Sequence, residues 1–193
     1  MRNLGIVESV TLDGVMQAPG SKDEDTRGGF EHGGWAQPYS DEVIGREMGK
    51  GMGSSELLFG RRTYEQMASY WPNAPKPNPF SDVLARTRKH VVSRTLREPL
   101  PWENSTLLKG DAYDAVARLK EESGDDLVIL GSGELVRSLM GRGLIDTYTL
   151  LIHPLVLGTG RRLFADDGSP APMKLVESVE STKGVLINTY RPA

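Results

Sequence analysis

The chain has 193 residues, of which 38% are hydrophobic and 25% charged, and its formal net charge is −3 at neutral pH. This length lies within the usual range of one compact domain, so the sequence predicts a single domain over residues 1–193. Cysteine is absent, which excludes disulfides, thiolate catalysis and cysteine metal sites. The densest basic group, Arg86, Arg88 and Lys89, is interpreted as a solvated face before a strand and not as a nucleic-acid surface.

No apolar run approaches the roughly eighteen residues that a membrane span requires, and the first residues lack the features of a signal peptide. We therefore expect a cytoplasmic protein with no membrane partner. The three histidines, His32, His90 and His153, include no pair at ligand spacing, so no metal site is expected.

The predicted elements alternate between strands and helices through the first three-quarters of the chain. Strands are expected where short apolar runs end at turn residues, and helices where apolar residues recur at helical spacing. In chain order the predicted strands are 4–12, 56–59, 90–93, 106–108, 127–130, 147–153, 176–179 and 185–190, and the predicted helices are 41–48, 62–70, 112–122 and 133–140. Ser40 and Asp111 are expected to cap the first and third of these helices.

This alternation predicts an α/β three-layer sandwich with a mostly parallel central sheet. The last two strands predict an antiparallel hairpin at its end. Residues 18–37, which are rich in glycine and charge, are expected to form a lid or binding loop. Residues 71–80, which contain four prolines, are expected to form a surface loop.

Three junctions share a pattern in which a strand ends, a glycine or small polar residue follows, and a helix or turn begins. Such a junction exposes backbone N–H groups beside the positive end of a helix, which suits a phosphate. In the first junction Gly60 permits close approach, Arg61 and Arg62 add positive charge, and Thr63 adds a hydroxyl. It is either a dinucleotide phosphate clamp or a plain turn before a helix with exposed arginines.

The second junction follows the strand that begins at His90. Ser93 and Arg94 could contact an adenosine ribose and its 2′-phosphate. Alternatively, they form only a solvated strand end.

At the third junction an aliphatic strand runs into Gly131, Ser132 and Gly133, and a helix continues through Glu134 and Leu135. This pattern is shorter than G-x-G-x-x-G and comes late in the chain, unlike a Rossmann fingerprint. Its place after the most apolar strand favours pyrophosphate binding by these five residues.

In this order the segments resemble the dihydrofolate reductase family and its relatives, the reductase domains of bifunctional riboflavin-biosynthesis enzymes. SVTLDGVM resembles the family's first strand and the start of its active-site loop. GRRTYE resembles its Gly-Arg-x-Thr cofactor motif, VVSR its 2′-phosphate strand end, and ILGSGELV its pyrophosphate glycines. LIHPLVLGTGRRLF resembles the riboflavin-type domains more than true dihydrofolate reductases. The resemblance spans nearly the whole chain and is closest to stand-alone bacterial proteins of the riboflavin type.

The resemblance implies a dihydrofolate-reductase-like fold with NADPH as the cofactor. Arg61 and Arg94 become candidates for the 2′-phosphate, Thr63 for the nicotinamide end of the pyrophosphate, and residues 131–133 for the pyrophosphate itself. The implied reaction is hydride transfer to a planar nitrogen heterocycle, either a pteridine or an aminopyrimidine of riboflavin biosynthesis. Homodimers are implied as well, because the riboflavin-type domains commonly pair.

True dihydrofolate reductases use an acidic residue on the helix after the active-site loop. Asp41 and Glu42 lie at that place and are the predicted catalytic acids, although the helix dipole favours acids there without any catalytic role. Asp13, Gln17 and Trp35 are predicted to contact the substrate, with turn chemistry and core packing as the alternatives.

A rival hypothesis is a nucleotide-binding module or sensor that uses the same fold without turnover, because a fold does not determine a function.

Overall fold

The computed structural model describes residues 1–50, 53–164 and 170–193. The chain forms two compact units, which are described separately. Unit 1 comprises residues 1–5 and 50–145, and unit 2 comprises residues 6–49 and 146–193. The chain passes from unit 1 to unit 2 within strand β1 (Leu4–Thr11). That the whole chain is one domain stays a prediction.

Unit 1 contains a parallel sheet with the strand order β4-β3-β2-β5, followed by the first residues of β1. Its strands are β2 (Ser55–Gly60), β3 (Lys89–Val92), β4 (Ser105–Leu108) and β5 (Asp126–Leu130). Gly60 pairs with Val92, and Val92 pairs with Leu108, so the carboxyl ends of these three strands are level. The residues that follow the strands therefore lie along one edge of the sheet.

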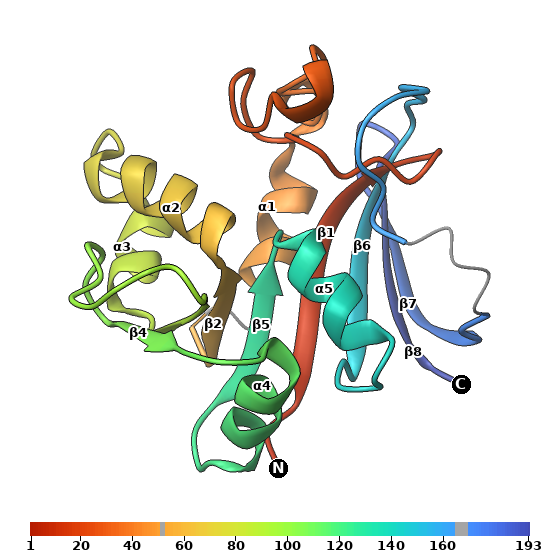
Figure 1. Ribbon diagram of the computed structural model, residues 1–193. Helices are drawn as coiled ribbons and strands as arrows, with labels where there is room; N and C mark the ends of the chain where they lie inside the picture. The colour runs from red at the N-terminus through yellow and green to blue at the C-terminus, as the bar shows by residue number, and fades with distance from the viewer. Residues whose placement is uncertain (51–52, 165–169) are drawn as a thin grey trace. The chain divides into compact units, whose positions relative to one another are not determined.

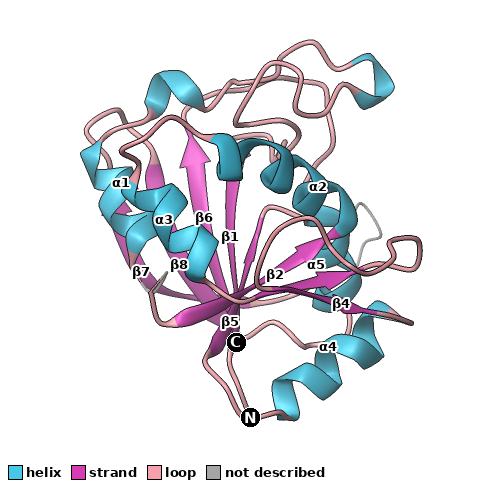
Figure 2. Cartoon of the chain, turned by 90° about the vertical axis from the view of Figure 1, so that its left-hand side faces the viewer, coloured by secondary structure: helices cyan, strands magenta, loops and turns pink. Residues whose placement is uncertain are grey.

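The helices of unit 1 are α2 (Arg61–Tyr70), α3 (Pro79–Arg86), α4 (Ala112–Glu121) and α5 (Gly133–Met140). Strands β2 and β5 run directly into α2 and α5, respectively (Figure 1). Figure 2 shows α2, α4 and α5 from a second side. The predicted cap of α4 is confirmed, since the Asp111 carboxylate accepts the N–H groups of Tyr113 and Asp114.

Helix α3 corrects the sequence interpretation, which places a proline-rich loop up to Phe80 and no helix after it. The Asn78 side chain accepts the Ser81 N–H at 3.1 Å, and Pro79 occupies the first helical position. A proline is favourable there because its missing N–H would have no partner within the helix. The last prolines of the segment therefore lead into a helix.

The interpretation of the basic group as a solvated face is wrong for Lys89, which is fully buried. Its ammonium donates to the carbonyl oxygens of Thr87 at 2.7 Å and Glu103 at 3.0 Å, and it lies 4.5 Å from the centre of the Trp102 ring. Burial lowers the pKa of Lys89 to about 8. This lysine therefore ties together the segments that flank β3.

Unit 2 contains the strand order β1-β6-β8-β7, with β6 (Thr147–His153), β7 (Met173–Glu180) and β8 (Leu186–Pro192). Both β6 and β7 pair with β8 in the antiparallel sense, which confirms the predicted hairpin. Helix α1 (Glu42–Gly49) packs Ile44 against Leu151 and Val185. The side chain that caps α1 is Asp41, which accepts the Ile44 N–H at 2.9 Å, and not the predicted Ser40.

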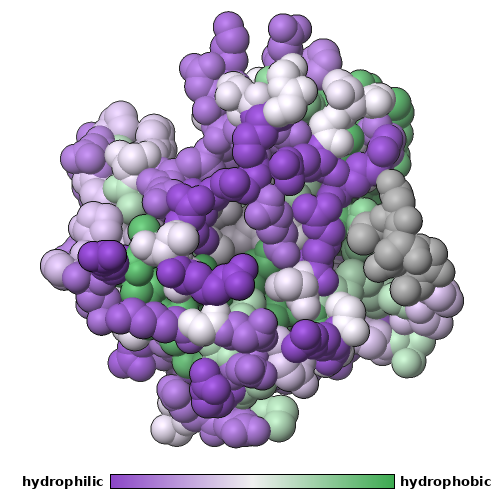
Figure 3. Space-filling model, in the orientation of Figure 1, coloured by the Kyte–Doolittle hydropathy of each residue, from purple (hydrophilic) through white to green (hydrophobic). Residues whose placement is uncertain are grey.

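Residues 12–41 of unit 2 form a long connection with two short 3₁₀ turns, at Arg27–Gly29 and Gln37–Tyr39. A small apolar cluster of Val15, Ala18 and Trp35 lies within it. Hydrophilic side chains cover most of the face shown in Figure 3. Within the described ranges, no helix has the length and apolar character needed to cross a bilayer.

Candidate functional site

The first and third predicted phosphate junctions of unit 1 are joined by hydrogen bonds. The Gly60 N–H donates to Ser132 Oγ at 3.0 Å, and the Ser132 N–H donates to Thr63 Oγ1 at 3.2 Å. Gly131 has φ +60°, and a Cβ at this position would lie 3.4 Å from the Thr63 methyl group. The starts of α2 and α5 are therefore held side by side. Glycine suits position 131 because its φ of +60° lies in the left-handed region, which residues with a side chain rarely adopt.

These two helices begin without a side-chain cap. Neither Gly60 before α2 nor Ser132 before α5 makes a capping hydrogen bond, whereas Asn78 and Asp111 cap α3 and α4. The first N–H groups of a helix have no partner within the helix, and the helix dipole places positive charge there. Two adjacent open helix starts therefore form a natural anion site.

Charged side chains strengthen this character. Arg61 and Arg62 open α2, which has no acidic residue in its first turn. Arginines at a helix start oppose the dipole, so this arrangement suits an anionic ligand better than it suits the helix itself. Arg61 pairs with Glu65 at 3.0 Å, and Arg62 pairs at 3.0 Å with Glu134, a predicted cofactor residue in the first turn of α5.

The second junction contributes one available cation. Ser93 is buried, and its hydroxyl accepts the N–H groups of residues 95 and 96, which fixes the turn after β3. Arg94 is exposed and makes no hydrogen bond or ion pair with any residue in the described ranges. Its guanidinium is therefore open to a phosphate.

Leu135 contributes packing to this site. Its side chain is buried, and its N–H donates to the Ser132 carbonyl oxygen at 2.8 Å. It therefore supports the turn into α5, and a contact of Leu135 with a cofactor stays a prediction.

In unit 2, Asp13 fixes the turn that follows β1. Its carboxylate accepts the Thr11 hydroxyl at 2.6 Å and the N–H groups of Leu157 at 3.2 Å and Gly158 at 2.9 Å. These bonds, the one from Thr11 above all, hold the pKa of Asp13 below its usual value. The Asp13 carboxylate therefore links the turn after β1 to the loop that contains Leu157 and Gly158, and it stays ionised.

Gln17 and Trp35 hold the long connection together. The Gln17 amide donates to the carbonyl oxygens of Asp25 and Arg27 and accepts the Arg161 N–H at 3.0 Å. Trp35 is only 7% exposed, and its indole N–H donates to the Gln17 carbonyl oxygen at 2.7 Å. Both residues have structural roles, so their contact with a substrate stays a prediction.

The predicted catalytic acids lie at the start of α1. Asp41 accepts the Ile44 N–H and also the N–H and hydroxyl of Thr182, both at 2.7 Å. These bonds, led by the one from Ile44, lower the pKa of Asp41 to about 2, so it is ionised at neutral pH. Glu42 is exposed in the first turn. Capping and the helix dipole explain both positions, and a catalytic role for either stays a prediction.

Sequence reasoning missed Glu8. It is 4% exposed on β1, and its Oε2 has no hydrogen-bond partner in the part of the chain that the structure describes. Burial raises the pKa of Glu8 to about 8, and the charge of Glu24 adds to this shift. The signal in the sequence was an acid in register with the inward-facing Leu4, Ile6 and Val10.

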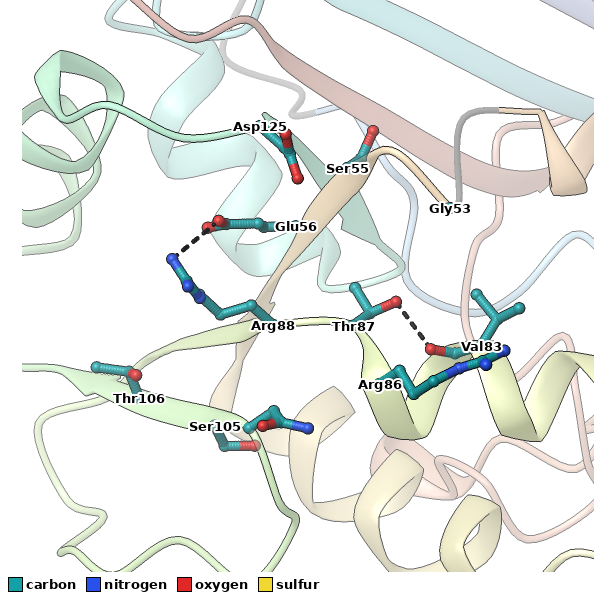
Figure 4. Close-up of a pocket in the computed structure, with 11 residues that line it drawn as sticks. Gly53, Ser55, Glu56, Val83, Arg86, Thr87, Arg88, Ser105, Thr106 and Asp125 are labelled. Atoms are coloured by element: carbon teal, nitrogen blue, oxygen red, sulfur yellow. Dashed lines mark hydrogen bonds and ion pairs between the residues drawn. The ribbon is translucent and has the colours of Figure 1, made fainter.

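A polar cavity of about 680 Å³ lies at the opposite, amino ends of β2, β3 and β4. In its wall, the Glu56 carboxylate accepts bonds from Arg2 at 2.6 Å, His90 at 2.6 Å and Arg88 at 3.2 Å, and Figure 4 shows the last of these. Burial alone would raise the pKa of Glu56, but the bonds from His90 and Arg2 outweigh it and lower that pKa. None of the predicted phosphate-binding residues lines this cavity.

Comparison with known proteins identifies the family. The sequence profile of the RibD C-terminal domain matches residues 4–187. The chain belongs to this family. Two Bacillus subtilis relatives, the uncharacterized proteins YyaP and YwjB, are 29% identical over 138 residues and 26% identical over 135 residues. These alignments cover 69% and 70% of this chain, respectively, and 72% of each relative.

Solved structures share the fold over almost the whole chain. A Shewanella sp. PV-4 protein described as a riboflavin biosynthesis protein superposes with a TM-score of 0.70 at 22% identity, covering 100% of this chain and 99% of that one. Dihydrofolate reductase from Enterococcus faecalis, complexed with NADP(H), superposes with a TM-score of 0.63 at 14% identity, covering 98% of this chain and 96% of that one. A pyrimidine reductase-like protein from Corynebacterium diphtheriae superposes with a TM-score of 0.66 at 13% identity, covering 100% of this chain and 92% of that one. The predicted dihydrofolate-reductase-like α/β fold is confirmed.

Proposed function

We propose that this RibD C-terminal domain protein is an NADPH-dependent reductase that transfers a hydride to a planar nitrogen heterocycle of the pteridine or riboflavin-pathway aminopyrimidine type. The family and the dihydrofolate reductase fold support a reductase. The observation that carries the choice of a phosphate-rich cofactor is the pair of uncapped helix starts, α2 and α5, joined through Ser132 and flanked by arginines.

The residues of unit 1 fit this cofactor. Thr63 and residues 131–133 would hold the pyrophosphate, since they surround the open helix starts. Arg61 and Arg94 would bind the 2′-phosphate that distinguishes NADPH from NADH, because a guanidinium presents a fork of donors to a phosphate. The dihydrofolate reductase neighbour, solved with NADP(H), supports the same choice.

When bound, NADPH supplies the hydride, and the chain must orient the acceptor and provide one proton. Asp41, with a pKa of about 2, carries no proton at neutral pH. Glu8 keeps its proton up to about pH 8 and belongs to unit 2, together with the predicted substrate residues. Of these two acids, only Glu8 is protonated at neutral pH.

A turnover assay tests the proposal. With NADPH and panels of dihydropteridines and aminopyrimidines, we expect substrate-dependent loss of nicotinamide absorbance for at least one compound. NADPH binding without turnover across both panels would favour the non-catalytic nucleotide-binding module. In that case Asp41, which accepts hydrogen bonds from Ile44 and Thr182, is only a helix cap. Failure to bind NADPH at all would contradict both functions.

A further inference from the structure

Each arginine at the start of α2 is already held by a glutamate. Arg61 Nη1 lies 3.0 and 3.3 Å from the two carboxylate oxygens of Glu65, one turn further along α2. Arg62 Nη1 lies 3.0 Å from Glu134 Oε1, so this second pair connects the first turns of α2 and α5.

These ion pairs contribute little to the stability of the helices. The four side chains are between 40% and 53% exposed, and exposed pairs are weak because water and salt screen them. In the pair within α2 the arginine precedes the glutamate, which is the less favourable order for a helix dipole. Both pairs can therefore be exchanged at low cost for a stronger anion.

We propose that Glu65 and Glu134 are built-in competitors for the phosphates of the nucleotide, each acting on a different part of it. This inference rests on the proposed NADPH site. Glu65 pairs with Arg61, the residue that would bind the 2′-phosphate. Glu65 therefore limits the preference for NADPH over NADH. Glu134 occupies Arg62 at the two open helix starts, so it limits the binding of the pyrophosphate that both nucleotides share.

The competition has two physical parts. A bound phosphate must take the guanidinium from the carboxylate, and the carboxylate then remains nearby as a like charge. The 2′-phosphate, which is a monoester, and the pyrophosphate as a whole each carry more charge and more acceptor oxygens than a single carboxylate, so each can displace it. Replacing the glutamate by glutamine removes both costs while keeping nearly the same side-chain size.

Calorimetric titrations of Glu65→Gln and Glu134→Gln separate the two roles. The probes are NADPH, NADH, and the fragments 2′,5′-ADP and 5′-AMP, which lack the pyrophosphate. Glu65→Gln should tighten NADPH and 2′,5′-ADP by about two- to fivefold and leave NADH and 5′-AMP unchanged. Glu134→Gln should tighten NADPH and NADH equally and tighten the two fragments equally but less, because each fragment keeps only the adenosine-side phosphate of the pyrophosphate.

Glu121→Gln, an exposed change at the end of α4, is the matched control and should alter no affinity. Both gains should shrink at 0.5 M salt, because exposed charges are screened there. Equal effects of Glu65→Gln on NADPH and NADH, or weaker binding in either variant, would overturn the inference and leave the NADPH site intact. If the unmodified protein does not bind NADPH, the proposed function itself is overturned.

Discussion

Two carboxyl groups of unit 2 hold their protons over different pH ranges. Glu8 is buried with an unpartnered oxygen and has a pKa of about 8, whereas Asp41 accepts three hydrogen bonds and has a pKa of about 2. Sequence reasoning chose Asp41 because it lies on the helix after the active-site loop, where true dihydrofolate reductases carry an acid. It passed over Glu8 because the burial of one side chain depends on the neighbouring strands.

Glu8→Gln should change how stability depends on pH. The pKa of Glu8 in the folded chain lies above the ordinary 4.5, so its protonated form favours folding. That contribution is complete below about pH 4.5 and is lost as the pH rises towards 8, a change on the order of several kcal/mol. Urea unfolding at pH 5, 7 and 9 should show the unmodified protein losing stability relative to the variant. Parallel pH profiles would contradict the assigned environment.

At the scale of the element, α1 depends on the Asp41 cap. Asp41→Asn should lower the melting temperature at pH 7, because the bonds from Ile44 and Thr182 weaken. The pKa of Asp41 is depressed, so its contribution is present above about pH 3.8 and is lost as the pH falls towards 2. The difference between variant and unmodified protein, followed by circular dichroism, should therefore disappear near pH 2. A constant difference down to that pH would rule out the ionised cap.

The turn from β5 into α5 depends on Gly131. Gly131→Ala should weaken nucleotide binding about tenfold and destabilise the fold by about 1 kcal/mol, because alanine is strained at φ +60°. Titration with NADPH and urea unfolding measure the two effects. Gly141→Ala is the matched control. Gly141 follows α5, its φ is in the ordinary helical range, and an added Cβ would meet no atom within 4 Å. Equal behaviour of the two variants would contradict the role of this turn.

Most of these elements could be predicted because local patterns determine them. The aliphatic run of β5, the Asp111 cap and the hairpin of β7 and β8 are all visible in short windows of sequence. Helix α3 was missed because prolines signal both loops and helix starts. The burial of Lys89 was missed because it depends on distant carbonyl oxygens.

The candidate site divides in the same way. The glycines and arginines of the cofactor half follow strand ends, so their order along the sheet could be predicted. Their pairing with Glu65 and Glu134 depends on side-chain positions across two helices. The substrate half could not be predicted, since Gln17 and Trp35 owe their roles to the path of a long irregular connection.

At the scale of the whole molecule, we predict a homodimer that uses β7. This strand ends the sheet order of unit 2 and exposes about half of Leu175 and Val176. An edge strand with exposed apolar residues favours pairing with another chain. Light scattering should give twice the chain mass, and Val176→Lys should give monomers, while Val156→Lys, in an exposed loop, should not. A monomer at all concentrations would contradict this prediction.

The central claim is that the open starts of α2 and α5, with Arg61 and Arg94, bind NADPH through its phosphates. Calorimetric titration of NADPH and NADH into the unmodified protein and into the Arg61→Ala, Arg94→Ala double variant tests it most directly. We expect the unmodified protein to prefer NADPH, and the double variant to lose at least about tenfold in NADPH affinity while NADH affinity changes little. An unchanged preference for NADPH in the double variant would contradict the account.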